Sequence, residues 1–221
     1  MTPAFIFDLD GTLVDTAPDL LDALNVLMAR EGRRLIDPVE MRHLVGRGAK
    51  VLIEQAFIET GDPVDPSRVD GLLEAYIAQY GAHIADSSRA YPGVVETLEK
   101  LQSEGVRMAV LTNKPHVMAE ALLPALGLDR FFTVVYGAGK KPYLKPDARL
   151  FADVLSDLGG AGPAVMVGDS ITDVQTARNA RVPVVLVSYG YTPEPAATLG
   201  ADALVDHFAD VPAAAKKLLG F

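Results

Sequence analysis

An apolar run that ends in two aspartates constrains the fold of this chain more than any other segment. Residues Ala4–Phe7 are all apolar, which is typical of a strand buried on both faces of a parallel sheet. Asp8 and Asp10 follow, and residues two apart in an extended chain project to the same side. Ligands bind open α/β sheets beyond the carboxyl ends of the strands. We therefore expect both carboxylates to face a binding crevice, although an Asp-Gly turn that caps a helix is an alternative interpretation.

The composition fits one large domain, or a core domain that carries a smaller insertion. The chain has 221 residues and 49% of them are apolar, so it can bury a sizeable core. A net charge of −9 without a Lys/Arg-rich block argues against nucleic-acid binding. An acidic protein that handles an anionic substrate must reverse its electric field locally, and a divalent metal ion would do so.

The chain contains no cysteine, which excludes disulfides and thiolate zinc sites and fits a reducing compartment. The N-terminal residues lack the basic flank and long apolar stretch of a signal peptide, and no apolar run reaches the length of a membrane span. We therefore expect a cytoplasmic protein that does not bind membranes.

The region after the first acidic loop predicts helices and no strands. Leucines recur at helical spacing after Pro18, and further helical patterns run through residues 51–58 and 72–84. A linker rich in Ser, Pro and Gly follows at 86–93. We predict an all-helical insertion over residues 16–88, within a core formed by the two segments 1–15 and 89–221.

From residue 94 onward, helices alternate with short, Val-rich strands. The predicted strands are 108–111, 133–136, 164–167 and 184–187, and the predicted helices are 94–101, 117–126, 150–158, 174–180 and 211–219. Such alternation implies right-handed crossovers and a parallel sheet, so the predicted fold class is α/β.

Polar side chains stand where the predicted strands end. Thr112 and Asn113 follow the predicted strand 108–111, and Asp169 and Asp173 follow the predicted strand 164–167. Lys145 stands at the start of the helix that is predicted between strands 133–136 and 164–167. Taken singly, Thr112 would be a helix cap, Lys145 a solvated lysine and Asp173 a capping residue. Their convergence with the first acidic pair on one sheet edge favours a phosphotransfer site.

The order and spacing of these segments resemble the haloacid dehalogenase superfamily. The motifs are DLDGTLVD, LTNK, LKPD and GDSITD, and they extend over nearly the whole chain. The resemblance implies a Rossmann-like parallel-sheet core with an inserted helical cap, an aspartyl-phosphate intermediate and Mg²⁺ as cofactor. It implies roles as nucleophile for Asp8, general acid/base for Asp10, phosphate binding for Thr112, Asn113 and Lys145, metal binding for Asp169, and support of Lys145 or a water for Asp173.

The chemistry of phosphate esters explains these residue types. A carboxylate attacks an anionic phosphate only if a cation, a lysine and oriented N–H groups relieve the repulsion. Oxygen ligands suit the hard Mg²⁺ ion, and we expect them from Asp8, Asp169 and the main-chain carbonyl of Asp10. The Asp10 side chain would then be free to protonate the leaving alkoxide and later to activate water.

Within the superfamily, the chain is most similar to phosphoglycolate phosphatases. The similarity lies in DLDGTLVDTAPDL, in LVGRGAKVL of the insertion and in the late Tyr-Gly-Tyr loop. Arg47 could pair with the carboxylate of 2-phosphoglycolate, because a guanidinium suits that planar group, or it could be a solvent-facing loop residue. Lys141 also precedes a proline, so it competes with Lys145 for the phosphate-binding role.

The sequence leaves two other functions open. A β-phosphoglucomutase-like isomerase would share the motifs and the cap, and a noncatalytic phosphate-binding regulator would share the site without its chemistry. The substrate we expect is a small phosphorylated metabolite, acted on by a monomer or a homodimer. Dehalogenation is disfavoured, because it does not need Asp10 together with a full magnesium site.

Overall fold

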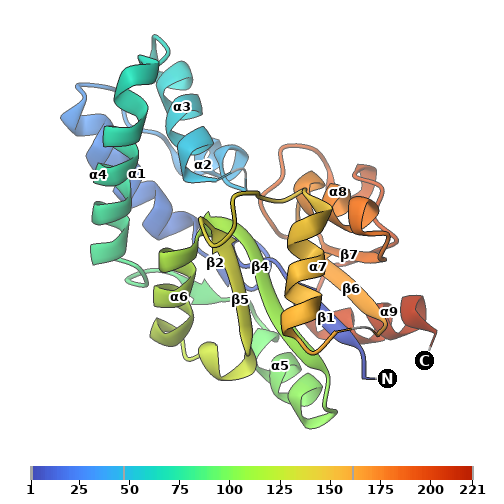
Figure 1. Cartoon of the computed structure of the whole chain (residues 1–221). Coiled ribbons are helices and arrows are strands. Elements are labelled where there is room, and N and C mark those ends of the chain that lie inside the picture. The colour runs from blue at the N-terminus through green and yellow to red at the C-terminus, as the bar shows by residue number, and fades with distance from the viewer. Residues whose placement is uncertain (1, 47, 161, 221) are drawn as a thin grey trace.

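Six parallel strands form the central sheet of the computed structural model, in the order β5-β4-β1-β6-β7-β8 (Figure 1). The structure describes residues 2–46, 48–160 and 162–220. The strands are β1 (Ala4–Phe7), β4 (Arg107–Pro115), β5 (Val134–Ala138), β6 (Ala164–Gly168), β7 (Val184–Val187) and β8 (Ala203–Val205). β1 pairs with β4 and β6, so the first apolar run lies inside the sheet. The predicted α/β class is confirmed.

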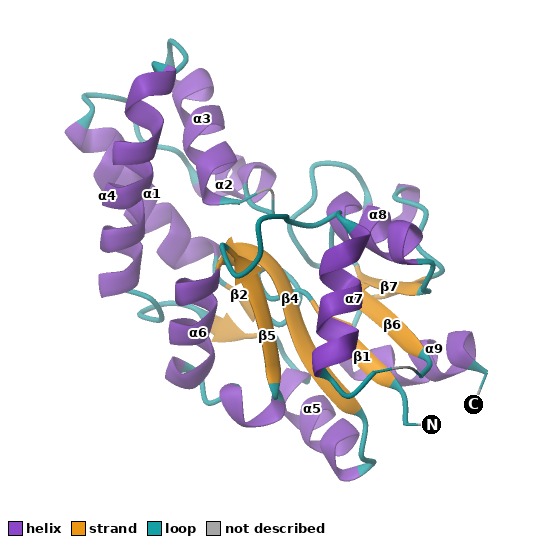
Figure 2. Cartoon of the chain, in the orientation of Figure 1, coloured by secondary structure: helices purple, strands orange, loops and turns teal. Residues whose placement is uncertain are grey.

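Helices cover both faces of this sheet (Figure 2). The first face packs against α5 (Val94–Ser103), α6 (His116–Ala125) and α9 (Val211–Leu219), and the second against α7 (Ala148–Asp157) and α8 (Ile171–Ala180). Side chains of β1 alternate between the two layers: Phe5 and Phe7 contribute to the first, Ala4 and Ile6 to the second. Burial on both faces is why this strand is apolar throughout.

The remaining α-helices form a separate group beyond the sheet (Figure 1). They are α1 (Ala17–Arg30), α2 (Pro38–Leu44), α3 (Ala49–Thr60) and α4 (Val69–Ala82), and they bury a hydrophobic cluster of their own. The sequence prediction missed α2, which is only seven residues long. Its signal is a capping box, in which Asp37 accepts from the Glu40 N–H and Glu40 accepts from the Asp37 N–H.

Two chain segments connect this helical group to the sheet, and they are bound to each other. β2 (Val14–Asp15) pairs antiparallel with β3 (Arg89–Ala90). Next to this ribbon, the buried Asp19 accepts hydrogen bonds from the main-chain N–H groups of Ser87 and Ser88 and from the Ser88 hydroxyl. The connection therefore has defined geometry on both chain segments.

Two further features were not expected from the sequence. β4 continues to Pro115, past the predicted end at Leu111, with a register shift against β5 after Leu111. β8 is a short edge strand of three half-buried or exposed residues, so it lacks the apolar run that marks the central strands. Short 3-10 turns occupy Pro66–Arg68, Asp129–Phe131, Ala196–Thr198 and Phe208–Asp210. Within the described ranges, none of the helices has the length and apolar character needed to cross a bilayer.

Candidate active site

Lys145 lies between two of the predicted carboxylates. Its Nζ atom is 2.8 Å from Asp8 Oδ2 and 2.7 Å from Asp173 Oδ1, and all three side chains are buried. Burial lowers the pKa of Lys145, but Asp173 and Asp8 outweigh that effect and hold the pKa above its ordinary value. The lysine is therefore a fixed positive charge beside Asp8.

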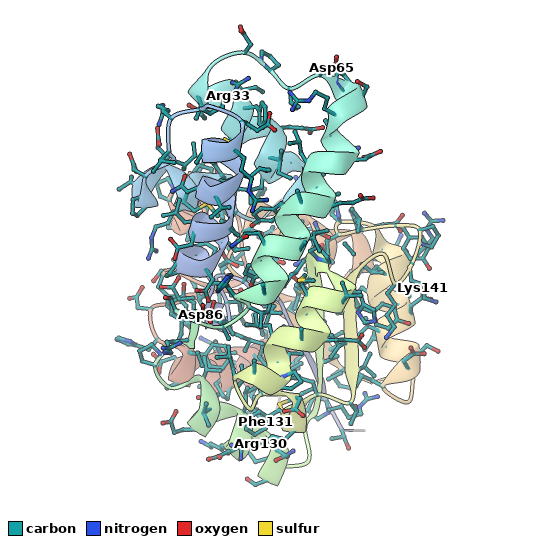
Figure 3. All side chains as sticks on the ribbon, turned by 90° about the vertical axis from the view of Figure 1, so that its left-hand side faces the viewer. Arg33, Asp65, Asp86, Arg130, Phe131 and Lys141 are labelled. Carbon is teal, nitrogen blue, oxygen red and sulfur yellow. The ribbon has the colours of Figure 1, made fainter. Side chains whose placement is uncertain are left out.

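The competing lysine, Lys141, lies elsewhere. Its Nζ atom is 3.1 Å from Asp153 Oδ2, and its side chain is 36% exposed. Figure 3 shows Lys141 at the periphery of the molecule. Of the two Lys-Pro steps, only the one at Lys145 places an ammonium group against Asp8.

Asp8 is held by its own loop as well as by Lys145. Its Oδ1 atom accepts from the Leu9 N–H at 2.8 Å. Burial raises the pKa of Asp8 to about 6, with the Lys145 charge acting in the opposite direction and Asp173 adding to the increase. The Lys145 charge alone therefore does not restore the ordinary pKa of Asp8.

Asp169 sits in a close-fitting pocket of backbone and hydroxyl groups. Its Oδ1 atom accepts from the Thr12 hydroxyl at 2.8 Å, and its Oδ2 atom accepts from the Tyr191 N–H at 2.7 Å. Burial, and then the neighbouring Asp173 and Asp8, raise the pKa of Asp169 well above its ordinary value. Unlike Asp8, which contacts Lys145, Asp169 forms no ion pair within the described part of the chain.

Asp8, Asp169 and Asp173 form a buried carboxylate group. One oxygen from each lies within 4.8 Å of the others. Such a set of oxygen donors fits a hard divalent cation, which would also offset the charge that burial penalises at Asp8 and Asp169. The predicted contribution of Asp10 to a metal site is through its main-chain carbonyl, and its side chain does not belong to this group.

Asp173 has a second set of contacts that the other two carboxylates do not have. Its Oδ2 atom accepts from the N–H groups of Asp169 and Ser170 and from the Ser170 hydroxyl. Because α8 begins at Ile171, Asp169 precedes the helix and Asp173 lies in its first turn. The sequence allowed two interpretations of Asp173, as a helix cap or as a support of Lys145. In the structure Asp173 has both contacts, since it caps α8 and binds Lys145.

Thr112 and Asn113 extend β4 into the site, and both are buried. The Thr112 hydroxyl accepts from the Lys114 N–H at 3.1 Å and does not cap α6, which begins four residues later. The Asn113 amide binds the main chain of Lys145 at both ends, donating to its carbonyl at 3.2 Å and accepting from its N–H at 3.0 Å. Asn113 thus fixes the loop that presents Lys145.

The side chain of Asp10 has different partners from Asp8. Its Oδ1 atom accepts from the Thr16 hydroxyl at 2.8 Å and from Lys114 Nζ at 3.0 Å. Lys114 also donates to the Tyr80 hydroxyl of α4 at 2.7 Å. The sequence prediction gave Lys114 no role, although it stands in the LTNK motif; its burial shows only when β4 is seen to continue past Leu111.

A second group that the sequence prediction left without a role is the hydroxyl of Tyr191. It accepts from the Ala17 N–H at 2.9 Å and donates to Asp15, and both residues lie where the chain passes from the sheet to α1. The same residue binds Asp169 through its main-chain N–H. Tyr191 therefore links Asp169, one of the three buried carboxylates, to the first residue of α1.

A pocket between the sheet and the helical group is lined by some of these residues, but not by Lys145, Asp169 or Asp173. Its lining includes Asp8, Asp10, Thr112 and Lys114 from the sheet side and Tyr80 from α4. Arg47, for which the sequence predicts a substrate contact, lies outside the described residues.

Comparison with known proteins places this site in a family. A sequence profile described as Haloacid dehalogenase-like hydrolase matches residues 5–187. A phosphoglycolate phosphatase of Caulobacter vibrioides is 48% identical over 214 residues, which cover 96% of this chain and 90% of that protein. A phosphoglycolate phosphatase of Agrobacterium fabrum is 42% identical, and the match covers 99% of this chain and 95% of that protein.

Solved structures have the same fold. A crystal structure of a predicted phosphoglycolate phosphatase from Haemophilus somnus has a TM-score of 0.89 at 31% identity, covering 96% of this chain and 97% of that one. CbbY from Rhodobacter sphaeroides, solved in complex with phosphate, has a TM-score of 0.79 at 27% identity, with 96% of each chain covered. The chain belongs to the haloacid dehalogenase-like hydrolase family. The predicted enzyme class, a phosphoric monoester hydrolase, is confirmed.

Proposed function

We propose that this phosphatase hydrolyses 2-phosphoglycolate to glycolate and phosphate through a phosphoaspartate on Asp8. The substrate is suggested by the relatives that match the chain over nearly its full length, which are named for phosphoglycolate. The observation that carries the mechanism is the contact of Lys145 with Asp8 and Asp173. A carboxylate nucleophile held against a buried cation is what attack on a phosphate anion requires.

The metal in this proposal is Mg²⁺. Asp8 and Asp169 would hold it, together with the main-chain carbonyl of Asp10, as the sequence predicts. Both oxygens of Asp173 already accept hydrogen bonds, from Lys145 on one side and from three donors on the other, which supports a positioning role for this residue. When bound, the ion would supply positive charge that offsets the repulsion of Asp8 and the phosphate anion.

The protein groups then perform two displacements at phosphorus. In the first, an Asp8 oxygen bonds to phosphorus, the bond to the ester oxygen breaks, and Asp10 gives its proton to the departing alkoxide. In the second, Asp10 takes a proton from a water that attacks phosphorus, and Asp8 leaves as a carboxylate. Lys145 and Thr112 hold the phosphate oxygens, and Asn113 contributes by fixing the Lys145 loop.

In this proposal residues 16–88 act as a cap over a core of residues 1–15 and 89–221. The pocket has lining residues from both parts, so closure of the cap would exclude water during attack, and opening would admit water and release product. Arg47 would contact the substrate from the cap, as the sequence predicts. The cytoplasmic location and the monomeric or dimeric state are likewise part of the proposal.

The test is release of inorganic phosphate from a panel of esters with added Mg²⁺. The panel contains 2-phosphoglycolate, sugar phosphates, xylulose-1,5-bisphosphate, nucleotides and pyrophosphate. The bisphosphate is included because an Asp-to-Asn mutant of CbbY, 27% identical to this chain, has been solved in complex with it. We expect the highest kcat/KM for 2-phosphoglycolate. An isomerised sugar phosphate without phosphate release would favour the mutase-like alternative, and no turnover of any ester would favour the regulator.

The same assay tests the nucleophile. Asp8→Asn should abolish turnover and leave the circular dichroism spectrum unchanged, because the amide is nearly isosteric with the carboxylate but cannot form an acyl phosphate. Near-native hydrolysis by this variant would refute the assignment of Asp8.

A further inference from the structure

Lys114 is the one cationic residue among the described residues that line the pocket. The other charged lining residues are Asp8 and Asp10, and the helical group adds mainly apolar side chains: Leu20, Val45, Leu52, Tyr76 and Ile77. A substrate with a second anionic group would therefore be repelled by both aspartates and desolvated by the apolar wall. It needs a cation on that side of the pocket.

The contacts of Lys114 leave it with binding capacity. Its side chain is only 2% exposed. Its Nζ atom contacts both oxygens of Asp10, Oδ1 at 3.0 Å and Oδ2 at 3.4 Å, and donates to the Tyr80 hydroxyl at 2.7 Å. Both Asp10 contacts go to one carboxylate, and a single N–H shared between its two oxygens can make them. Because an ammonium group has three N–H donors, one is then left for a further acceptor. The Tyr80 oxygen accepts from Lys114, which leaves the phenolic hydrogen to be donated. Burial raises the pKa of Tyr80 above its ordinary value, so the phenol keeps that hydrogen.

The position of Lys114 next to Asp10 matches the covalent structure of the substrate proposed above. In 2-phosphoglycolate a single methylene group separates the ester oxygen from the carboxylate carbon. A residue that protonates the ester oxygen and a residue that binds the carboxylate must therefore be neighbours. Asp10 has the first role in the proposed mechanism, and Lys114 lies within hydrogen-bonding distance of it.

We infer that Lys114 Nζ and the Tyr80 hydroxyl together bind the carboxylate of the substrate. The pocket is thereby selective for phosphate esters whose alcohol part carries an anionic group next to the ester carbon. One of the two donors comes from the core and the other from α4, so the carboxylate bridges the two sides of the pocket. This inference rests on the proposed function and adds to it the residues that determine specificity.

The test compares two esters of similar size, of which only one carries an anionic group in its alcohol part. 2-Hydroxyethyl phosphate has an alcohol group where 2-phosphoglycolate has its carboxylate. Lys114→Met keeps the length of the side chain and removes its charge. We expect the ratio of kcat/KM for 2-phosphoglycolate to that for 2-hydroxyethyl phosphate to fall about tenfold or more, the usual size of a lost hydrogen bond to a charged group. Displacement of Asp10 would slow both esters alike and so cancels in the ratio.

α4 provides a matched pair of variants for the hydroxyl. Tyr80 and Tyr76 are both buried, and their rings stack. Among the described residues, however, the one hydrogen-bond partner of the Tyr76 hydroxyl is the Leu20 carbonyl, at 3.5 Å. Tyr80→Phe should lower the ratio severalfold, and Tyr76→Phe should leave the ratio unchanged. An equal fall in both variants would show a packing effect and overturn the role of Tyr80.

A binding measurement covers the case in which Lys114→Met has no turnover. Calorimetry with Mg²⁺ would compare Asp8→Asn with the double variant Asp8→Asn/Lys114→Met. We expect the second substitution to weaken binding of 2-phosphoglycolate about tenfold or more, and binding of 2-hydroxyethyl phosphate much less. Equal weakening of both esters would overturn the inference.

The wild-type protein separates this inference from the proposed function. If wild type does not prefer 2-phosphoglycolate over 2-hydroxyethyl phosphate, the proposed substrate is wrong. If wild type prefers it and Lys114→Met keeps the same preference, only the role of Lys114 is wrong.

Discussion

The side chain of Asp169 occupies the space that a Cβ atom on Gly190 would need. An ideal Cβ at Gly190 would stand 2.2 Å from Asp169 Cβ and 2.4 Å from its Oδ2 atom. Gly11 approaches the same carboxylate, with an ideal Cβ at 2.5 Å from Oδ2 and a backbone φ of +80°. Glycine at these two positions lets the backbone come close enough to fix the carboxylate.

Gly190→Ala should therefore displace Asp169. We expect the variant to require a higher Mg²⁺ concentration for half-maximal activity and to lose about 1–3 kcal/mol of unfolding free energy through overpacking. Both are measured directly, by a Mg²⁺ titration of phosphate release and by urea unfolding. The control is Gly71→Ala, because Gly71 is exposed in α4 with no other atom near its ideal Cβ. A Mg²⁺ titration that Gly190→Ala leaves unchanged would remove Asp169 from the metal site.

Lys145→Met should be far more damaging than Lys141→Met. The first change leaves Asp8 and Asp173 buried without their shared cation, and breaking such a buried pair costs about 3–5 kcal/mol. The second removes a partly exposed ion pair with Asp153, worth about 0–1 kcal/mol. In kcat/KM we expect a loss of about 10²-fold or more for Lys145→Met and little change for Lys141→Met. The reverse order would assign phosphate binding to Lys141.

The stability of the metal-free protein should depend on pH through Asp8. Burial raises the pKa of Asp8 from 3.8 to about 6, so the folded state disfavours the ionised form. The stability that Asp8 contributes is fully present below its unfolded pKa and is lost as the pH rises through about 6. Between about pH 4 and pH 7, wild type should therefore lose unfolding free energy relative to Asp8→Asn. A constant difference between the two proteins across this range would contradict the raised pKa.

The activity should have the opposite dependence on pH. Because the nucleophile must be ionised, kcat/KM at low Mg²⁺ should fall as the pH drops below about 6. Added Mg²⁺ favours the carboxylate form and should move the midpoint to lower pH. A midpoint that is independent of Mg²⁺ would place the metal away from Asp8.

Arg47→Ala tests the prediction from the sequence that this residue binds the carboxylate of the substrate. We expect a lower ratio of kcat/KM for 2-phosphoglycolate to that for 2-hydroxyethyl phosphate, because a guanidinium binds a carboxylate with two parallel hydrogen bonds. Arg47→Lys should recover only part of the loss, since an ammonium group keeps the charge and loses this geometry. An unchanged ratio in both variants would leave Lys114 as the proposed carboxylate contact.

Local patterns in the sequence were enough for most of the fold. The apolar run at β1 and the Val-rich run at β7 predict those strands with the bounds observed, because central parallel strands are buried on both faces. The sequence did not predict α2, because it is only seven residues long, or β8, because it has no apolar run. β4 was predicted too short because its last residues are polar, although they are buried at the site.

The sequence by itself also determined the candidate residues. Asp8, Asp10 and Asp169 lie just beyond the carboxyl ends of β1 and β6, and Thr112 lies in the last part of β4, and parallel pairing brings these strand ends to one edge. Only the tertiary structure decided which side chains meet there. It places Lys145 rather than Lys141 on Asp8, and it joins Lys114 to Asp10, 104 residues away in the chain. Periodicity reports which face of an element is buried, whereas these contacts depend on how elements distant in sequence pack against one another.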